Sequence, residues 1–415
     1  MHVCVIGAGV VGIASAYSFA RRGHRVTVLD ETDGPGRGTS YANGGQLSYS
    51  YVAPLADPSI WGDLPKYLVD PDSPLTLRLS PDIAQWTWML RFLLACNSRS
   101  ASLTTAALLQ LAFFSRQALD ALRAAVDIDF GHRVAGKLVM LSSRDQVEKA
   151  KRQVELQATL GCEQEVLSIE RCIHIEPALL RSRERWAAGV YTPSEEVGDC
   201  ARFCDELARV LRNAYRVQFE FNSRVTGAIS RGPRIEALKT AQGEISADLY
   251  VMANGAGASI LGRQLGLSLP VYPLKGYSVT MEAGSGSLPR VSITDLGKKI
   301  VYARLGDRLR VAGRAELVGH DDRVDAKRCE QLAQEAMTLF SAERSEVNGI
   351  SPWAGLRPAT PSGKPIIGTT PINNLMINVG HGALGWTLAC GSGELLARML
   401  DGEPIPFDHA PFRYR

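Results

Sequence analysis

The stretch HVCVIGAGVVGIASAYSFARRGHRVTVLD, residues 2–30, decides which fold this sequence predicts. Residues 2–6 are mostly apolar and β-branched, which is typical of a buried strand. Glycine-rich residues follow at 7–12, and the apolar side chains after them recur at helical spacing until Gly23. A second strand, RVTVLD at 25–30, ends in an acid. Strand, glycine turn, helix and strand together predict a βαβ unit of the dinucleotide-binding kind.

The three glycines of the turn have separate roles in such a unit. Gly7 permits the tight turn, Gly9 lets a pyrophosphate approach the backbone, and Gly12 lets the helix pack closely on the strand. Val10 and Val11 open the helix, so that its free N–H groups and positive end face the phosphates. A chance glycine-rich turn is the structural alternative.

Asp30 stands where a dinucleotide-binding protein needs an acceptor for the ribose diol. A carboxylate at this place disfavours a 2′-phosphate, so it argues against NADP. The βαβ unit alone does not show whether the bound dinucleotide is NAD or FAD.

Three further segments favour FAD over NAD. GTSYANGGQ (38–46) offers hydroxyl donors and paired glycines for a phosphate and a flat ring, and LYVMANGAG (249–257) is a strand that ends in small residues. GHGALGWT (380–387) opens a helix whose N-terminus would stabilise negative charge on a reduced flavin. Each could be an ordinary turn. Beyond residues 7–30, the predicted cofactor contacts are Thr39, Ser40, Gly44, Gly45, Gln46, Val225, Asn254, Gly255, Gly382, Gly385, Trp386 and Thr387.

Composition excludes several other classes of protein. The chain has 415 residues, of which 45% are hydrophobic and 21% charged, so it is neither disordered nor collagen-like. Lys and Arg number 46 against 43 Asp and Glu, a balance that does not indicate a nucleic-acid partner. The eight cysteines include no CxxC pair and the seven histidines show no metal spacing, so we expect buried thiols and no metal.

The ends and apolar runs of the sequence indicate a cytoplasmic protein. MHVCVIGAGVVG at the N-terminus lacks the basic region and cleavage site of a signal peptide. The longest apolar run, WTWMLRFLLA at 86–95, is too short for a membrane span and Arg91 interrupts it. This run is interpreted first as a packed helix, and alternatively as a surface for peripheral contact with the inner face of the plasma membrane.

The order of the predicted elements indicates two discontinuous domains. An α/β domain with a Rossmann-like sheet is expected from residues 1–50, 195–255 and 350–415. Residues 51–194 and 256–349 are expected to form a substrate domain around a mixed or antiparallel sheet, so that the protein is α+β overall.

Several long stretches carry a resemblance to a known family. The chain is similar over nearly its whole length to the FAD-dependent oxidoreductases related to D-amino acid oxidase and glycine oxidase, and among these to the bacterial D-amino acid dehydrogenases. Asn43 to Gly45 and residues 51–135 match less well. The matching stretches are VIGAGVVGIASAY (5–17), TSYANGGQLS (39–48), EVGDCARF (196–203), VYPLKGYS (271–278), GLRPATPSGKPIIG (355–368) and GHGALGWTLACGSGELL (380–396).

The resemblance implies a D-amino acid oxidase-like fold and a substrate site. Arg357 matches the arginine that clamps the substrate carboxylate, which suits a planar guanidinium. Tyr302 matches a tyrosine that donates a second hydrogen bond to that carboxylate. His381 and Tyr51 could contact ring or substrate, although a structural histidine and ordinary aromatic packing are the alternatives.

The resemblance also implies a reaction. The substrate is a D-amino acid such as D-alanine. Its neutral amine form passes a hydride from Cα to flavin N5, and water hydrolyses the iminium to a 2-oxo acid and ammonia. Electrons then pass to a quinone or another acceptor. The alternatives are glycine, sarcosine or a cyclic D-imino acid such as D-hydroxyproline as substrate, or a flavin subunit within a larger electron-transfer complex.

Overall fold

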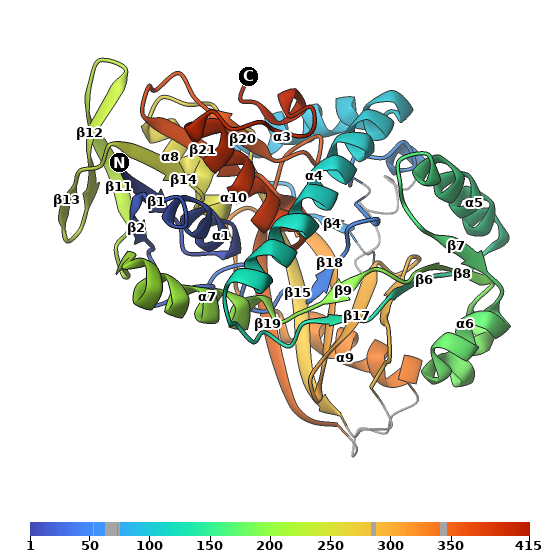
Figure 1. The fold of residues 1–415 in the computed structure, drawn as a ribbon. Helices are drawn as coiled ribbons and strands as arrows, with labels where there is room; N and C mark the ends of the chain where they lie inside the picture. The colour runs from blue at the N-terminus through green and yellow to red at the C-terminus, as the bar shows by residue number, and fades with distance from the viewer. Residues whose placement is uncertain (53, 63–72, 74, 284–287, 341–346) are drawn as a thin grey trace.

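Two large sheets organise the molecule (Figure 1). The computed structural model describes residues 1–52, 54–62, 73, 75–283, 288–340 and 347–415. The stretch 51–80, expected to be loop and short helix, lies partly outside these residues.

The first sheet contains the predicted βαβ unit. Within the described residues it has six strands in the order β10-β2-β1-β14-β21-β20, and all neighbours are parallel except the last pair. These strands are β1 (His2–Ile6), β2 (Arg25–Leu29), β10 (Gln218–Glu220), β14 (Leu249–Met252), β20 (Ile366–Thr369) and β21 (Leu375–Val379). Such a sheet joins segments from both ends and the middle of the chain, as the sequence predicts.

Helices cover this sheet. The helix α1 (Val10–Ala20) packs between α7 (Cys200–Tyr215) and α10 (Gly385–Asp401), and α4 (Ser98–Ala125) crosses α10 on its other side (Figure 1). The α8 helix (Ala258–Gln264) follows β14. Although α4 falls in the range 51–194 that the sequence assigns to a substrate domain, its apolar side chains belong to the same core as α1 and α10.

The second sheet is mixed. Nine of its strands lie in the described residues, in the order β19-β15-β18-β17-β16-β6-β8-β7, with β4 paired to β18. They are β4 (Leu75–Leu77), β6 (Lys137–Leu141), β7 (Glu165–Leu167), β8 (Ala188–Thr192), β15 (Tyr272–Ala283), β16 (Ser292–Asp295), β17 (Ile300–Leu305), β18 (Arg308–Leu317) and β19 (Val347–Ala359). The expected boundary at residue 350 therefore falls inside a strand of this sheet.

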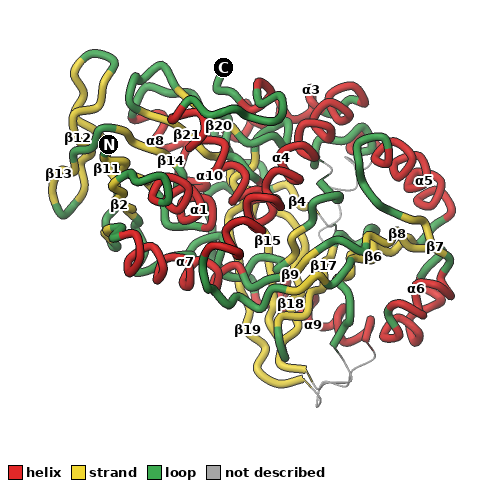
Figure 2. The backbone as a smooth tube through the Cα atoms, viewed as in Figure 1, coloured by secondary structure: helices red, strands yellow, loops and turns green. Residues whose placement is uncertain are grey.

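Two faces of the second sheet have different neighbours. The helix α9 (Ala326–Phe340) packs on one face, in a core with Tyr277, Val279 and Val311. The loop that follows residue 39 lies on the other face, where the Oγ of Ser278 donates to the carbonyl of Ala42. Figure 2 shows α5 (Arg144–Ala158) and α6 (Ile169–Ile175) beside the β7 and β8 end of the sheet.

Smaller elements complete the fold. Strands β11 (Val225–Arg231), β12 (Arg234–Thr240) and β13 (Gly243–Ile245) form a projecting sheet, and β3 (Gln46–Leu47), β9 (Glu196–Val197) and β5 (Arg133–Val134) form another. The helix α3 (Ile83–Ala95) begins at Asp82, whose carboxylate accepts from the N–H of Ala84. No helix in the described ranges has the length and apolar character that crossing a membrane requires. All eight cysteines are buried and free, as the sequence predicts.

We expect Gly391→Ala to destabilise the protein, because the added Cβ would lie 2.7 Å from the Cα of Ser115, where α10 crosses α4. Overpacking of this kind costs about 1–3 kcal/mol, which exceeds the gain in helix propensity of about 1 kcal/mol. Urea unfolding followed by circular dichroism in excess FAD measures the loss. The matched control is Gly227→Ala, whose Cβ would meet nothing within 4 Å and should change stability by less than about 0.5 kcal/mol. Equal stability of the two variants would contradict the tight crossing.

Candidate active site

The glycine turn has the shape that a dinucleotide needs. Gly7 adopts φ +110°, and a Cβ there would lie 2.5 Å from the carbonyl oxygen of Ala253. A Cβ on Gly12 would lie 1.8 Å from the carbonyl oxygen of Gly7, so no larger residue fits either place. Gly9 precedes α1 without a side-chain cap, while the N–H of Val10 donates to the Oγ of Ser40 at 3.0 Å.

Asp30 follows the last residue of β2 and forms a hydrogen bond with the glycine turn. Its Oδ2 accepts from the N–H of Ala8 at 2.5 Å, and its Oδ1 accepts from the N–H and hydroxyl of Thr32. A carboxylate offers about four acceptor positions, so capacity remains for a ribose hydroxyl. Next to it, the N–H of Ser223 donates to the Asp30 carbonyl, two residues before Val225 begins β11. The predicted contacts Asp30 and Val225 therefore lie at the same end of the sheet.

The segment from Thr39 to Gln46 bridges the two sheets. Thr39 donates its hydroxyl to the carbonyl of Leu356 on β19 at 2.7 Å. A Cβ on Gly44 would lie 3.0 Å from Val301 of β17, and one on Gly45 would lie 3.1 Å from Leu305. These glycines are therefore needed where the loop passes directly over the second sheet.

Two more chain segments meet near this loop. Asn254 precedes Gly255 after β14, and its buried Oδ1 has no partner. The helix α10 begins at Gly385 directly after the 3₁₀ turn Gly382–Leu384, and neither segment has a side-chain cap. The hydroxyl of Thr387, in its first turn, accepts from the N–H of Ser48.

The Trp386 side chain packs in the core, while the predicted cofactor contact at this residue stays a prediction. Its indole N–H donates to the carbonyl of Gly198, and its ring packs against Phe130 and Phe203. The ring fills the core below the first turn of α10, so only its backbone can meet a ligand there.

These residues fit a flavin dinucleotide. Two helix N-termini without side-chain caps offer N–H groups to anions, one for a pyrophosphate and one for the pyrimidine edge of a flavin. An unpartnered amide oxygen at Asn254 and bare glycine backbone at Gly44 and Gly45 are further features that a bound cofactor would satisfy.

Arg357 has no acidic partner among the residues that the structure describes. It lies on β19 opposite Leu274, and its side chain occupies the space beside Gly276, where a Cβ would lie 2.4 Å from Nη2. In the part of the chain that the structure describes, its hydrogen bond goes to the carbonyl of Arg314 at 3.4 Å, and no carboxylate lies within 4.0 Å. Burial lowers the pKa of Arg357, yet guanidinium remains charged at neutral pH. The structural ion pair that could explain this arginine is absent from the described residues.

His381 lies close to the same strand. It forms an isolated bridge with Ala359, two residues after Arg357. Burial lowers the pKa of His381 to about 3, so the imidazole is neutral, and its Nε2 has no hydrogen-bond partner. A neutral, unsatisfied ring nitrogen in this position is available to a ligand.

Tyr302 is not brought to Arg357, which corrects the expectation that it donates to the substrate carboxylate. Successive side chains of a strand point to opposite faces, and the neighbours Val301 and Ala303 take the face of the loop. Tyr302 points to α9, where its ring meets Phe340 edge-on at 5.6 Å. Its buried hydroxyl has no partner there.

Tyr51 lies beside Lys137, a charged residue that the sequence analysis did not identify. Its ring lies 4.4 Å from the Nζ of Lys137, which donates to the Oγ of Ser48 at 2.8 Å. Glu195 is also buried here and accepts from the N–H of Ser50 at 2.7 Å. The only sequence signal was a single lysine at the start of the apolar strand KLVML. Burial raises the pKa of Tyr51 to about 12.

Known proteins resemble this chain over nearly its full length. A family model described as FAD dependent oxidoreductase (DAO) matches residues 2–399. A protein of Ralstonia nicotianae named D-amino acid dehydrogenase 2 is 46% identical over 99% of both chains. A D-amino acid dehydrogenase of Paramagnetospirillum magneticum is 42% identical over 97% of this chain and 96% of its own.

Solved structures share the fold. Glycine oxidase from Geobacillus kaustophilus superposes with a TM-score of 0.79 at 23% identity, covering 100% of this chain and 98% of its own. L-proline dehydrogenase from P. horikoshii gives a TM-score of 0.75 at 19% identity, over 97% of this chain and 94% of its own. These likenesses establish the D-amino acid oxidase-like fold that the sequence predicts.

We expect Asp30→Ala to weaken FAD binding roughly tenfold to a hundredfold, because a hydrogen bond to a charged group contributes about 1.5–3 kcal/mol. Fluorescence titration of the apoprotein with FAD measures the dissociation constant. The control Asp33→Ala removes an exposed carboxylate from the same loop and should leave the constant unchanged. Equal FAD affinity in both variants would remove Asp30 from the cofactor site.

Proposed function

Since this chain belongs to the DAO family of FAD-dependent oxidoreductases, we propose that it oxidises D-amino acids such as D-alanine to 2-oxo acids and ammonia. It uses FAD, an amino acid and an electron acceptor. Both enantiomers of an amino acid offer the same carboxylate and amine, so the arginine alone does not select one. The names of the relatives support the D configuration.

The unpaired guanidinium of Arg357 is the observation that carries this proposal. A buried cation without an acidic partner is costly unless a ligand supplies the negative charge. An amino acid brings a carboxylate that can accept two parallel hydrogen bonds from one arginine. This pair fixes the orientation of the substrate as well as its position.

The residues of the site do the work of orientation. When bound, FAD accepts the hydride that leaves the substrate Cα. Arg357 holds the carboxylate, so that Cα can be presented in one orientation only. His381 is neutral and its Nε2 has no partner among the described residues. It can therefore accept a hydrogen bond from the substrate amine without becoming protonated. The iminium product is then hydrolysed by water.

Two other functions are less well supported. Glycine, sarcosine and cyclic D-imino acids would need the same clamp, but the relatives at 38–46% identity are named for D-amino acids. A dependent flavin subunit need not keep an unpaired arginine in this place. Anaerobic mixing of the purified chain with D-alanine, L-alanine, glycine, sarcosine and D-hydroxyproline separates these functions, because only a substrate bleaches the flavin absorbance.

For the acceptor we propose a membrane quinone, reached through peripheral contact with the inner face of the plasma membrane. The outer face of α3 supports this proposal. Ile83, Trp86, Leu90 and Leu94 recur three to four residues apart, so they share one side of the helix, and they are 80, 48, 62 and 71% exposed. Such an exposed apolar stripe, with Arg91 next to it, suits the interface of a bilayer.

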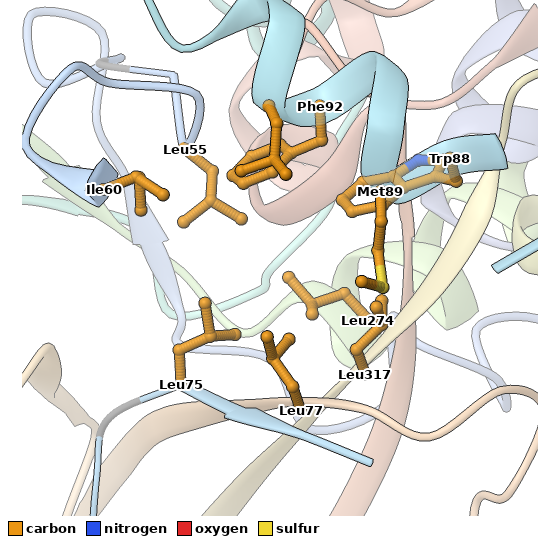
Figure 3. A pocket seen from close by; sticks show the side chains of 10 residues that line it. Leu55, Ile60, Leu75, Leu77, Trp88, Met89, Phe92, Leu274 and Leu317 are labelled. Carbon is orange, nitrogen blue, oxygen red and sulfur yellow. The ribbon is translucent and has the colours of Figure 1, made fainter. Parts of the chain in front are cut away.

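The inner face of α3 covers an apolar pocket (Figure 3). Trp88 and Phe92 stack there, and the indole of Trp88 donates to the carbonyl of Ala359, which ends the strand that carries Arg357. The cavity is about 40 Å³, whereas a cavity that admits benzene is about 150 Å³. Because a quinone ring does not fit it, we propose contact through the outer face. The lining residues are Leu55, Ile60, Leu75, Leu77, Trp88, Met89, Phe92, Leu93, Leu274 and Leu317.

We expect Arg357→Ala to lower kcat/KM for D-alanine on the order of 10²–10³-fold, because losing one partner of a buried charge pair costs about 2–5 kcal/mol. The loss should lie mainly in KM, with FAD content unchanged, as measured by steady-state kinetics and the visible spectrum. Arg357→Lys keeps the charge without the planar fork and should recover only part of the activity. Wild-type kinetics in Arg357→Ala would refute the clamp.

We expect the double variant Leu90→Glu, Leu94→Glu to bind vesicles at least about tenfold more weakly, since burying each leucine contributes about 1.5–3 kcal/mol. Co-sedimentation with phosphatidylethanolamine–phosphatidylglycerol vesicles measures this. Leu156→Glu, Leu180→Glu is the matched control, because these leucines are exposed on other elements. Identical binding of both double variants and the wild type would exclude α3 as the contact surface.

A further inference from the structure

Two buried lysines lie on the second sheet, one on each face. Lys137 on β6 is 2% exposed and Lys275 on β15 is 3% exposed. Each ammonium lies over a tyrosine ring, at 4.4 Å from Tyr51 and 5.3 Å from Tyr277. Their surroundings otherwise differ.

Lys275 belongs to a charged network on the α9 face. Its Nζ lies 3.9 Å from a carboxylate oxygen of Asp321. Tyr277 donates to Glu316, which pairs with Arg328 of α9. The positive charge of Lys275 is therefore matched within the protein.

Lys137 points to the opposite face. Its neighbours Leu138 and Met140 alternate into the α9 core, so Lys137 and Val139 face away from α9. On the adjacent strand, Ser292 and Thr294 pair with Lys137 and Val139, and both hydroxyls are buried without partners. In the described part of the chain no carboxylate lies within 4.0 Å of Nζ.

This ammonium adjoins the segment that we assign to the flavin. The loop passes from Gly44 over β17 to Ser48, whose hydroxyl accepts from Nζ. The N–H of Ser48 donates to Thr387 in the first turn of α10. One residue therefore connects Lys137 to the helix N-terminus that would face the pyrimidine edge of the ring.

The missing negative charge suggests what Lys137 is for. Taking a cation out of water costs several kcal/mol unless an opposite charge meets it. The ring of Tyr51 and the hydroxyl of Ser48 compensate in part. Burial lowers the pKa of Lys137 to about 8, and the charge of Glu195, the nearest buried acid, only partly opposes this shift. Burial in turn raises the pKa of the Glu195 carboxyl, and its Oε2 has no partner among the described residues. A further negative charge is expected from a ligand.

We propose that Lys137 stabilises the negative charge that the flavin gains on reduction, and so sets its reduction potential. In that step the substrate Cα–H bond breaks, two electrons and the hydrogen pass to N5 as hydride, and one negative charge is added to the ring. The ammonium and the α10 N-terminus then act on the same charge. This inference rests on the proposed function only through its cofactor.

The test uses sulfite, because its lone pair adds to flavin N5 and places the same negative charge on the ring without any amino acid. We expect the sulfite dissociation constant of the FAD-loaded variant Lys137→Met to rise about tenfold or more, read from bleaching of the flavin absorbance. A tenfold change corresponds to about 30 mV for a two-electron couple. Dye equilibration should therefore show a midpoint potential lower by about that amount.

Three comparisons make the result specific. Lys275→Met removes the other buried lysine and should leave both values unchanged, while Lys137→Arg keeps the charge and should recover most of the sulfite affinity. If Lys137→Met does not retain FAD, Lys137→Gln carries the same measurement. Unchanged sulfite affinity and potential in the neutral variants, or equal shifts in Lys275→Met, would overturn the proposal. Because neither readout needs a substrate, a failed D-amino acid assay would not affect this result.

Discussion

The two-residue period of the β-strand is the constraint on which the chemistry of this protein depends. One face of the second sheet is covered by α9, and the other face contacts the loop 39–48, to which we assign the flavin. Along β17, β6 and β15 this period decides which side chains can reach a ligand. Val301 and Lys137 face the loop, whereas Tyr302 and Lys275 face α9. Two lysines of one sheet, Lys137 and Lys275, therefore have different surroundings, and so do the neighbours Val301 and Tyr302.

Close packing of α1 against α10 positions the part of the site that lies on the first sheet. A Cβ on Gly393 would lie 2.8 Å from the backbone of Ser15, so α10 and α1 approach each other at backbone distance. Both helices begin next to the loop 39–48, and neither is capped by its own N-cap residue, although Ser40 of that loop accepts from the N–H of Val10. A capping side chain would compete with a ligand for the same N–H groups. Tight packing and the missing N-cap side chains thus leave both helix N-termini accessible to a ligand at the same place.

The sequence predicted the βαβ unit, because glycine turns and strand ends are local features, and the structure brings several of the predicted site segments together. Asp30 and Val225 lie together at one end of the first sheet, and Arg357 and His381 lie near one another. The direction of Tyr302 could not be predicted, since a shift of one residue in the strand exchanges the two faces. Trp386 has a core role because Phe130 and Phe203, distant in sequence, enclose it. Lys137 was missed because a single lysine in an apolar strand has no periodic signal.

Lys137 is buried and Arg357 is partly buried, and neither has an acid within 4.0 Å among the described residues, so the site is electrostatically incomplete on its own. Arg357 lies on β19, at one end of the strand order of the second sheet, and Lys137 lies on the inner strand β6; each loses hydration on folding. The free energy that this burial costs is recovered only when anionic groups arrive, and ligands that bind the folded state stabilise it by mass action. A hydrophobic side chain at either place would give a more stable apoprotein with no means of holding a carboxylate or a reduced flavin. The chain therefore gives up stability where it needs charge, which is the ordinary relation between stability and activity in an enzyme site.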